Sequence, residues 1–134
     1  MTKSVLKVSC AIILKGTKFL AAQRNANQDH PLHWEFPGGK LKNGESAPDS
    51  IVREIKEELE IIVSPTQQLE AIYHDYGNKQ IELIPFICPA YQGDIVVHEH
   101  AKIKWVTLDQ ASTLQWAEAD LKIIEQLRQK GLVP

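Results

Sequence analysis

A glycine-rich loop that runs into an amphipathic helix restricts the fold more than any other segment. Gly38-Gly39 and Asn43-Gly44 bracket the loop, and the helix body is expected to extend to about Leu59. Ser46 is suited to cap this helix, with Asp49 three residues later as the acidic partner of a capping box. The side of the helix predicted to face a core carries Ala47, Ile51, Ile55 and Leu59, joined by Val52.

The polar side of the same helix is strongly acidic. With about 100° between successive residues, Glu58 falls about 60° from the centre of the apolar stripe, Glu54 about 100° and Glu57 about 160°. The three acids are connected at i, i+3 and i+4 spacing, where like charges repel, and the helix dipole disfavours acids in the last turn. A hard divalent cation such as Mg²⁺ would relieve this repulsion, because it prefers oxygen ligands. A solvated acidic face is the alternative interpretation.

Strand-like runs and turn signals in the rest of the chain predict a mixed sheet covered by helices. The expected strands are residues 5–14, 19–23, 70–76, 80–88 and 103–106, and a second helix is expected over 118–129, with Leu121, Ile124 and Leu127 at helical spacing. Gly16 and Gly77 lie in short links that indicate hairpins, and Gly131 is expected to stop the last helix. Residues 25–33 are typical of an exposed loop. Pro85 predicts a sheet edge or a bulge within 80–88.

Length and composition exclude several classes of protein. The chain has 134 residues, 43% of them hydrophobic, which favours a single domain over 1–134, and its net charge of −2 gives no basic field to hold a nucleic acid polymer. The apolar run 8–14 fits a first strand better than a secretory signal, and no run approaches the ~18 residues of a membrane span. Cys10 and Cys88 lack metal or redox spacing and are expected to be buried thiols. We therefore expect a cytoplasmic protein, monomeric or weakly homodimeric, with no membrane or nucleic acid polymer as partner.

The spacing of residues 39–61 resembles the Nudix box. That pattern is Gly, five residues, Glu, seven residues, Arg-Glu, an aliphatic residue, any residue, Glu-Glu, any residue, Gly and an aliphatic residue. The positions that match in register are Gly39, Glu45, Arg53, Glu54, Ile55, Glu57, Glu58 and Ile61. The departure is Glu60, which stands where the pattern has Gly and must manage the turn after the helix without an easy positive φ.

The resemblance extends beyond the box to the MutT-like subgroup of the Nudix family. Residues 20–24 and 34–40 are similar to the strand and loop that precede the box, and Glu99 is similar to an additional metal-ligating Glu on a late loop. The fold that the resemblance implies is α+β, the Nudix fold, with a mixed β-sheet sandwiched between helices in an α/β/α arrangement. The activity that it implies is that of a nucleoside triphosphate pyrophosphohydrolase, an enzyme acting on phosphoric anhydrides.

The same resemblance implies roles for residues of this chain. The implied cofactor is Mg²⁺, with Mn²⁺ as a substitute, and the implied ligands are the Gly38 carbonyl, Glu54, Glu57, Glu58 and Glu99. The candidates for accepting a proton from the attacking water are Glu58 and, preferred over it, Glu54 or Glu99. The expected substrate contacts are Arg24, Glu35, Phe36, Lys40 and Asp120. The residues expected to act structurally are Gly39, Glu45 and Arg53, with the arginine fork bridging carboxylates.

Some of these residues keep a second interpretation from their chemistry alone. Arg24 and Lys40 are equally suited to be solvated surface cations. Glu99, which lies between His98 and His100, also fits a solvated loop acid. The two histidines are expected at the surface and receive no role.

Base selection is expected near the start of the last helix. Asp120 aligns with the place where MutT-like enzymes present a polar residue to the base, although the 8-oxoguanine-reading enzyme has Asn there. An ionised Asp offers acceptors only, whereas a protonated Asp also donates. The alternative for Asp120 is a helix-start residue favoured by the dipole. Trp116, Trp34 and Phe36 are either stacking walls or core residues.

The function implied by the resemblance is Mg-dependent hydrolysis of oxidised nucleoside triphosphates such as 8-oxo-dGTP. Water attacks the β-phosphorus and releases nucleoside monophosphate and pyrophosphate, which sanitises the nucleotide pool and prevents mutation during DNA replication. The first alternative is the same chemistry on CTP-type or other nucleoside diphosphate-linked substrates. The second is a non-catalytic nucleotide-binding Nudix domain, against which the intact set of Glu54, Glu57 and Glu58 argues.

Overall fold

A long N-terminal strand lies at the centre of the sheet in the computed structural model, which describes residues 4–133. This strand, β1 (Val5–Lys15), turns at Gly16 into the antiparallel strand β2 (Lys18–Gln23). Gly16 has a φ of +61°, a conformation that glycine adopts without steric cost. β1 also pairs in parallel with β8 (Gln80–Cys88) and antiparallel with β4 (Gly38–Lys40). The glycine-rich segment 38–40 is therefore a strand beside β1.

The main sheet has eight strands and is mixed, in the order β10-β2-β1-β8-β6, with β3 beside β2, β4 beside β1 and β7 beside β8. The strands of this sheet not yet given are β3 (Trp34–Glu35), β6 (Gln67–Gln68), β7 (Ile72–Asp75) and β10 (Lys102–Val106). A separate pair consists of β5 (Ile62–Val63) and β9 (Tyr91–Gln92). The hairpin expected around Gly77 is confirmed as β7 and β8. Sequence periodicity does not predict the strands of two or three residues, because they are too short to show it.

Pro85 lies in a central strand, so the expected sheet edge is wrong. β8 has β1 on one side and, on the other, β7 up to Leu83 and β6 from Phe86. The Pro85 carbonyl accepts a hydrogen bond from Leu69 N at 2.9 Å, on the side where the partner strand is interrupted. Since N–H and C=O of one residue point to the same side of a strand, the missing proline N–H faces this interruption and costs β1 no hydrogen bond.

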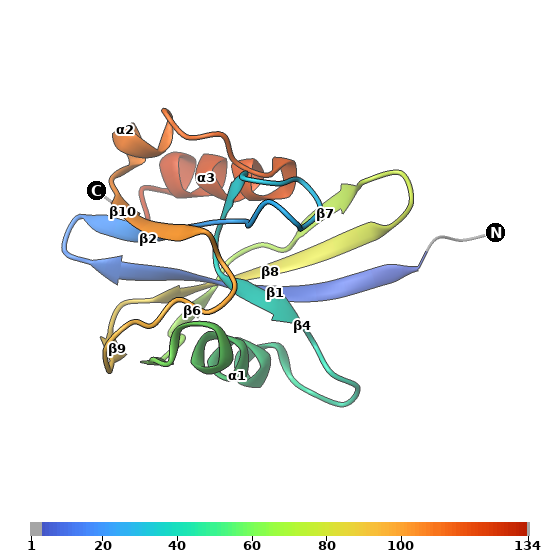
Figure 1. Cartoon of the computed structure of the whole chain (residues 1–134), viewed down its shortest axis with the longest axis horizontal. Coiled ribbons are helices and arrows are strands. Elements are labelled where there is room, and N and C mark those ends of the chain that lie inside the picture. The colour runs from blue at the N-terminus through green and yellow to red at the C-terminus, as the bar shows by residue number, and fades with distance from the viewer. Residues whose placement is uncertain (1–3, 134) are drawn as a thin grey trace.

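Two helices cover opposite faces of the sheet, as the sequence predicted. α1 (Ala47–Leu59) lies on one face and α3 (Glu118–Lys130) on the other, with the short α2 (Leu108–Ala111) at the same level as α3 (Figure 1). Each face has its own apolar core: Ile51, Ile55 and Leu59 of α1 pack in one, and Ile123, Ile124 and Leu127 of α3 pack in the other. Leu121 is 44% exposed, so the buried stripe of α3 runs through 120, 123, 124 and 127 rather than through 121.

The ends of α1 follow the local sequence. Ser46 Oγ accepts a hydrogen bond from Asp49 N at 3.2 Å, which is the serine half of the predicted capping box. The helix ends at Glu60, which adopts the left-handed conformation with φ +58° and donates its N–H to Lys56 O. Glu60 thus occupies the conformation that glycine would take without strain. α3 ends at Gly131, as expected.

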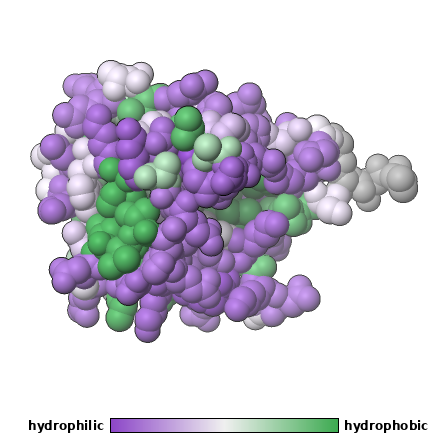
Figure 2. Space-filling view, viewed as in Figure 1, coloured by the Kyte–Doolittle hydropathy of each residue, from purple (hydrophilic) through white to green (hydrophobic). Residues whose placement is uncertain are grey.

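The surface is mostly polar on the face shown in Figure 2. A hydrophobic patch lies on the left of this view, by the segment that joins β9 to β10, which carries the exposed Val96 and Val97. A hollow lies near the centre of the same view. In the described part of the chain, no helix has the length and apolar character needed to cross a membrane.

Candidate active site

A cavity of about 370 Å³ opens where β1, β3, β4 and the start of α3 meet, and a volume of this size suits a small-molecule ligand. It brings together residues that the sequence predicted for three different roles. The predicted residues that line it are Arg24, Glu35, Phe36, Gly38, Gly39, Lys40, Glu58, Glu99 and Asp120. The other four, Glu45, Arg53, Glu54 and Glu57, lie behind this lining on or beside α1.

Arg53 joins α1 to the loop that precedes it. Its Nε and Nη2 donate to the two carboxylate oxygens of Glu45 at 2.7 and 2.9 Å, and Nη2 also donates to Lys40 O at 3.2 Å. Its Nη1 donates to Glu54 at 2.9 Å and to Glu57 at 3.2 Å. The guanidinium lowers the pKa of Glu45 to about 2. Arg53 therefore bridges three carboxylates and holds the loop against the helix.

The backbone of β1 requires glycine at position 38, and glycine at position 39 leaves room for the Glu54 carboxyl. A Cβ at position 38 would lie 1.9 Å from Ser9 O on β1, and one at position 39 would lie 2.3 Å from the carboxyl carbon of Glu54. Toward the same helix, Ser9 Oγ and Ser50 Oγ form a buried hydrogen bond at 2.9 Å that fixes α1 to β1. The Glu54 carboxyl thus packs directly on the backbone of Gly39.

Glu58 is the acid that points toward the core edge, as its helical angle predicted. Burial raises its pKa to about 9, and the nearby charges of Glu35, Glu54 and Glu99 act in the same direction. A hydrogen bond from the Gly38 N–H opposes this shift. Its Oε2 is buried and has no hydrogen-bond partner among the described residues. In the absence of a cation, this carboxyl is therefore protonated at neutral pH.

Three of the predicted metal ligands, Gly38, Glu58 and Glu99, line the cavity, whereas Glu54 and Glu57 lie on α1 outside the lining, so the set is not gathered at a single point. Within residues 4–133, no three His, Cys, Asp or Glu side chains form a group able to hold an ion. Arg53 contacts both Glu54 and Glu57, and the Glu57 side chain is 57% exposed. The donors are nevertheless all oxygen, and the unpartnered Glu58 oxygen is a buried acceptor that a cation would satisfy. The set fits a hard divalent cation that competes with Arg53 for these carboxylates.

The opposite end of the cavity is formed by Phe36 and Asp120. Phe36 N donates to Asp120 Oδ1 at 2.9 Å, although the two residues lie 84 positions apart. Burial raises the pKa of Asp120 to about 8, and the charge of Glu35 adds to this effect. The hydrogen bond from Phe36 and the charge of Arg24 oppose it. Asp120 is therefore a buried neutral acid at pH 7, with one oxygen already used by the backbone.

Glu35 lies between these two ends and is held from two sides. Arg24 Nη1 donates to its Oε1 at 2.7 Å, and His100 Nε2 lies 2.9 Å from its Oε2. The expectation that both late-loop histidines lie at the surface is wrong for His100, whose side chain is 5% exposed, against 47% for His98. His98 instead contacts Glu60 next to the end of α1. Strand-like alternation would place these two histidines, two residues apart, on the same side of the chain, but this loop is not a strand and buries His100 while leaving His98 exposed.

Other residues near the cavity were not predicted, or were left with two interpretations. Trp116 and Trp34 are both buried and belong to the core, with Trp116 Nε1 donating to Ala111 O. Phe36 packs against Trp116 with ring centroids 5.0 Å apart and also lines the cavity. Cys10 and Tyr76 line the cavity without having been assigned to it. The Tyr76 hydroxyl accepts from Ala119 N at 3.2 Å, which links the β7–β8 turn to α3.

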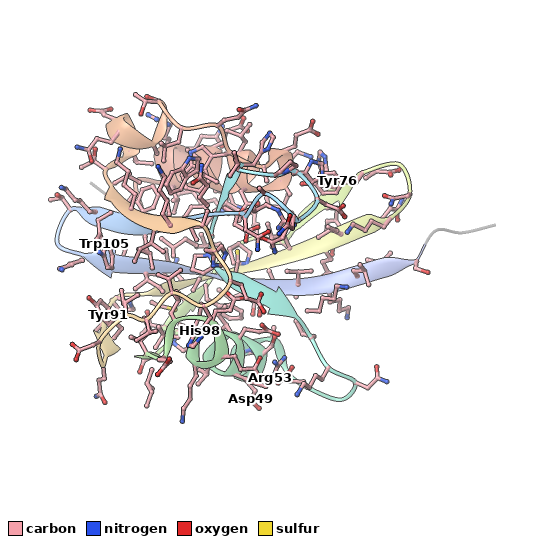
Figure 3. All side chains as sticks on the ribbon, in the orientation of Figure 1. Asp49, Arg53, Tyr76, Tyr91, His98 and Trp105 are labelled. Carbon is pink, nitrogen blue, oxygen red and sulfur yellow. The ribbon has the colours of Figure 1, made fainter. Side chains whose placement is uncertain are left out.

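The two ends of the site come from opposite layers of the fold. Figure 3 shows Arg53 on α1 below the sheet and Tyr76 above it, near α3. The lower end offers carboxylates, the Gly38 backbone and the exposed Lys40, which suit a cation and phosphates. The upper end offers an aromatic ring and a buried polar group, which suit a planar base.

Comparisons with known proteins agree with this arrangement. The family model described as "NUDIX domain" matches residues 3–127. The CTP pyrophosphohydrolase of Escherichia coli (strain K12) is 32% identical over 121 residues, which is 90% of each chain. An 8-oxo-dGTP diphosphatase of Haemophilus influenzae is 29% identical over 129 residues, covering 95% of this chain and 94% of that protein. The solution structure of the E. coli ORF135 protein, 32% identical, superimposes with a TM-score of 0.84 over 94% of this chain and 92% of that one.

Proposed function

This chain belongs to the Nudix family and is a Nudix hydrolase acting on nucleotides, and from that premise we propose that it cleaves nucleoside triphosphates to nucleoside monophosphate and pyrophosphate. The observation that carries the proposal is the cavity that joins the acidic end at Gly38 and Glu58 to the aromatic end at Phe36 and Asp120. A nucleotide has the same polarity, with anionic phosphates at one end and a planar base at the other.

The acidic end holds the phosphates together with a divalent cation. Its carboxylates alone would repel a triphosphate, so binding there requires positive charge. The residues that would hold Mg²⁺, with Mn²⁺ as a substitute, are the Gly38 carbonyl, Glu54, Glu57, Glu58 and Glu99. When bound, the cation neutralises phosphoryl oxygens and supplies an activated water. Lys40 and Arg24 add positive charge at the two sides of the cavity.

A carboxylate of this chain accepts the proton of the attacking water. Glu54 is oriented by Arg53 at 2.9 Å and by its packing on Gly39, whereas Glu99 is exposed on the loop before β10. Glu58 is more deeply placed and holds its own proton until a cation binds. We favour Glu54 or Glu99 for this role. Gln variants at the three positions, measured over a range of Mg²⁺ concentrations, separate loss of the base from loss of a ligand.

Asp120 and Phe36 read the base. A neutral carboxylic acid presents a donor and an acceptor side by side, which matches an adjacent acceptor and donor on a base edge. An oxidised guanine and a cytosine both offer such a pair. The first substrate we propose is 8-oxo-dGTP, for which the H. influenzae relative is named. The second is CTP, supported by the E. coli relative of that name at 32% identity.

The biological role that we propose is removal of oxidised nucleotides before DNA replication uses them. Residues 1–134 would act as one cytoplasmic domain, as a monomer or weak homodimer. Expression in a bacterium that lacks its own 8-oxo-dGTP diphosphatase tests this role, and we expect the mutation frequency to fall toward the wild-type level. An unchanged frequency, with active protein present, would contradict it.

The primary experiment measures pyrophosphate release from normal and oxidised nucleoside triphosphates, dinucleotides and ADP-ribose, with Mg²⁺ and with chelator. We expect release that the chelator abolishes, and 8-oxo-dGTP or CTP as the preferred substrate. Hydrolysis in ¹⁸O-labelled water should label pyrophosphate and leave the monophosphate unlabelled, because attack occurs at the β-phosphorus. Lack of turnover on every compound, or label in the monophosphate, would overturn the proposed reaction.

A further inference from the structure

His100 is a buried histidine in the wall of the site to which the reaction above assigns no role. It lines the cavity next to Glu99 in the sequence. One residue separates it from β10 (Lys102–Val106). Its side chain is 5% exposed, whereas the side chain of His98, two residues earlier on the same loop, is 47% exposed. A histidine buried in this way needs a polar partner, and its partner is Glu35.

The Glu35 carboxylate receives a donor on each of its oxygens. Arg24 Nη1 donates to Oε1 at 2.7 Å and His100 Nε2 lies 2.9 Å from Oε2. Arg24 is itself held by a hydrogen bond from its Nε to Asp29 O at 2.6 Å. The terminal torsion of a glutamate is broad, so one donor leaves the carboxylate free to turn. Two donors on different oxygens fix the plane of the group.

The orientation of Glu35 affects both ends of the cavity. It ends β3 and is followed by Phe36, whose N–H donates to Asp120. The charge of Glu35 also contributes to the raised pKa values of Asp120 and Glu58, so the carboxylate lies near both acids. A ligand that extends from one end of the cavity to the other must pass this carboxylate.

The environment of His100 indicates which nitrogen carries the proton. Its Nδ1 is buried and has no hydrogen-bond partner among the described residues. A proton on Nδ1 would be a buried donor without an acceptor, and Nε2 would then face the carboxylate with a lone pair. The tautomer with the proton on Nε2 avoids both, so His100 donates to Glu35.

We propose that His100 is a positioning residue that, by donating from Nε2, holds the Glu35 carboxylate in the orientation in which the nucleotide binds. The inference deepens the proposed function and rests on it. His100 acts through Glu35 at the nucleotide, and not through its neighbour Glu99 at the cation.

The test measures binding of the two product nucleotides, 8-oxo-dGMP and CMP, by calorimetry in the presence of saturating Mg²⁺. We expect His100→Ala to weaken the better-bound nucleotide about tenfold, which is the effect of losing one hydrogen bond to a charged group. His100→Gln should restore most of the affinity, because its amide nitrogen can reach the position of Nε2 and donate. His98→Ala is the matched control on the same loop, and we expect wild-type binding.

Three further measurements separate positioning from a general structural effect. Kinetics with Mg²⁺ should show KM raised about tenfold in His100→Ala, with kcat changed less than twofold. In a Glu35→Ala background, His100→Ala should cause no additional loss, since residues that act through one another are not additive. Long-range ¹H–¹⁵N spectra of the wild type should show the protonated nitrogen of His100 as Nε2.

Several results would overturn the inference. They are unchanged nucleotide affinity in His100→Ala, equal loss in His98→Ala, additive loss in the Glu35→Ala background, or a proton on Nδ1 in the wild type. Weaker Mn²⁺ binding in His100→Ala with normal nucleotide binding would place its effect at Glu99 instead. If wild-type protein bound neither nucleotide, the proposed function would fail first and this inference with it.

Discussion

The two ends of this site, the proposed cation end at Gly38 and Glu58 and the proposed base end at Phe36 and Asp120, are built in different ways. The cation end comes almost entirely from one continuous stretch, residues 38–58, plus Glu99, and its acids are partly exposed and shared with Arg53. The base end combines Phe36 with Asp120, which lie far apart in the sequence and are both buried. A local motif thus supplies most of the end proposed to hold phosphates, whereas the end proposed to read the base depends on how the whole sheet is assembled.

The acids at the two ends also differ in the groups that stabilise them. At the cation end, Arg53 stabilises Glu54 and Glu57 in a state that a divalent cation must replace. At the base end, Asp120 is satisfied by the Phe36 N–H and needs no cation. Changes at the first end should therefore affect all nucleotides alike, and changes at the second should affect some nucleotides more than others.

The largest effect is expected from Glu58→Gln at the cation end. Turnover should fall about 10³-fold for every nucleotide, the range in which loss of a charged group at a reacting centre lies. Stability without metal should be preserved, because the neutral amide replaces a carboxyl that is already protonated at pH 7. Steady-state rates and urea denaturation check the two parts.

Glu60→Gln is the matched control, since it makes the same chemical change two residues later on an exposed side chain. Its turnover should equal that of the wild type. A similar loss in both variants, or an effect of Glu58→Gln that depends strongly on the base, would break the distinction between the ends.

Asp120→Ala should change selectivity more than rate. We expect the ratio of kcat/KM values for 8-oxo-dGTP and CTP to change about tenfold, the value of one hydrogen bond to a base edge. The dependence on Mg²⁺ concentration should be that of the wild type. Equal loss for every base tested would show that Asp120 supports Phe36 without reading the base.

The next effect concerns the pH dependence of stability without metal. The pKa of Asp120 is about 8 in the folded protein and 3.8 in the unfolded chain. Between these two pH values the folded state therefore binds more protons than the unfolded state. Stability contributed by this group is therefore lost as the pH rises from about 4 to 8. Asp120→Asn should gain stability relative to the wild type over this range and show a constant difference above it. Urea denaturation with chelator measures this, and a constant difference from pH 5 to 8 would contradict it.

The smallest effect is expected at the end of α1. Glu60→Gly should raise the free energy of unfolding by about 0.5 kcal/mol, because glycine adopts the left-handed conformation without the strain of a side chain. It also removes the contact with His98, which lies between exposed side chains and contributes little. Urea denaturation compares the variant with Glu60→Gln, which loses the charge and keeps the strain. Lower stability of the glycine variant would show that the His98 contact fixes the loop.

The sequence predicted the order of burial of the three helix acids for physical reasons. Helical spacing alone ordered Glu58, Glu54 and Glu57 from the core outward, and the structure has Glu58 and Glu54 partly buried and Glu57 exposed. The cap at Ser46 and a mixed sheet covered by helices also followed from local patterns, whereas the placing of helices on both faces was implied by the resemblance to the Nudix family. These features depend on contacts within a few residues or on one amphipathic face.

The features that the sequence did not predict depend on long-range pairing. Pro85 is tolerated in a central strand because the neighbouring strand is interrupted there, which no local pattern reports. His100 can be buried because it forms a hydrogen bond with Glu35, which lies 65 positions away in the sequence. The burial of Asp120 could have been predicted, since positions 120, 123, 124 and 127 have helical spacing, but Leu121 suggested a different apolar stripe.

The position of Cys10 affects how readily its thiol can be oxidised. Cys10 lines the cavity on the α3 face of the sheet, whereas Cys88 lies in the core on the α1 face, so the sheet separates the two thiols and excludes a disulfide between them. Burial raises the pKa of the Cys10 thiol well above its usual range, and the negative charge of Glu35 adds to this. Since peroxides attack the thiolate, this cysteine resists oxidation. The thiol that borders the cavity is therefore held in its protonated, poorly reactive form.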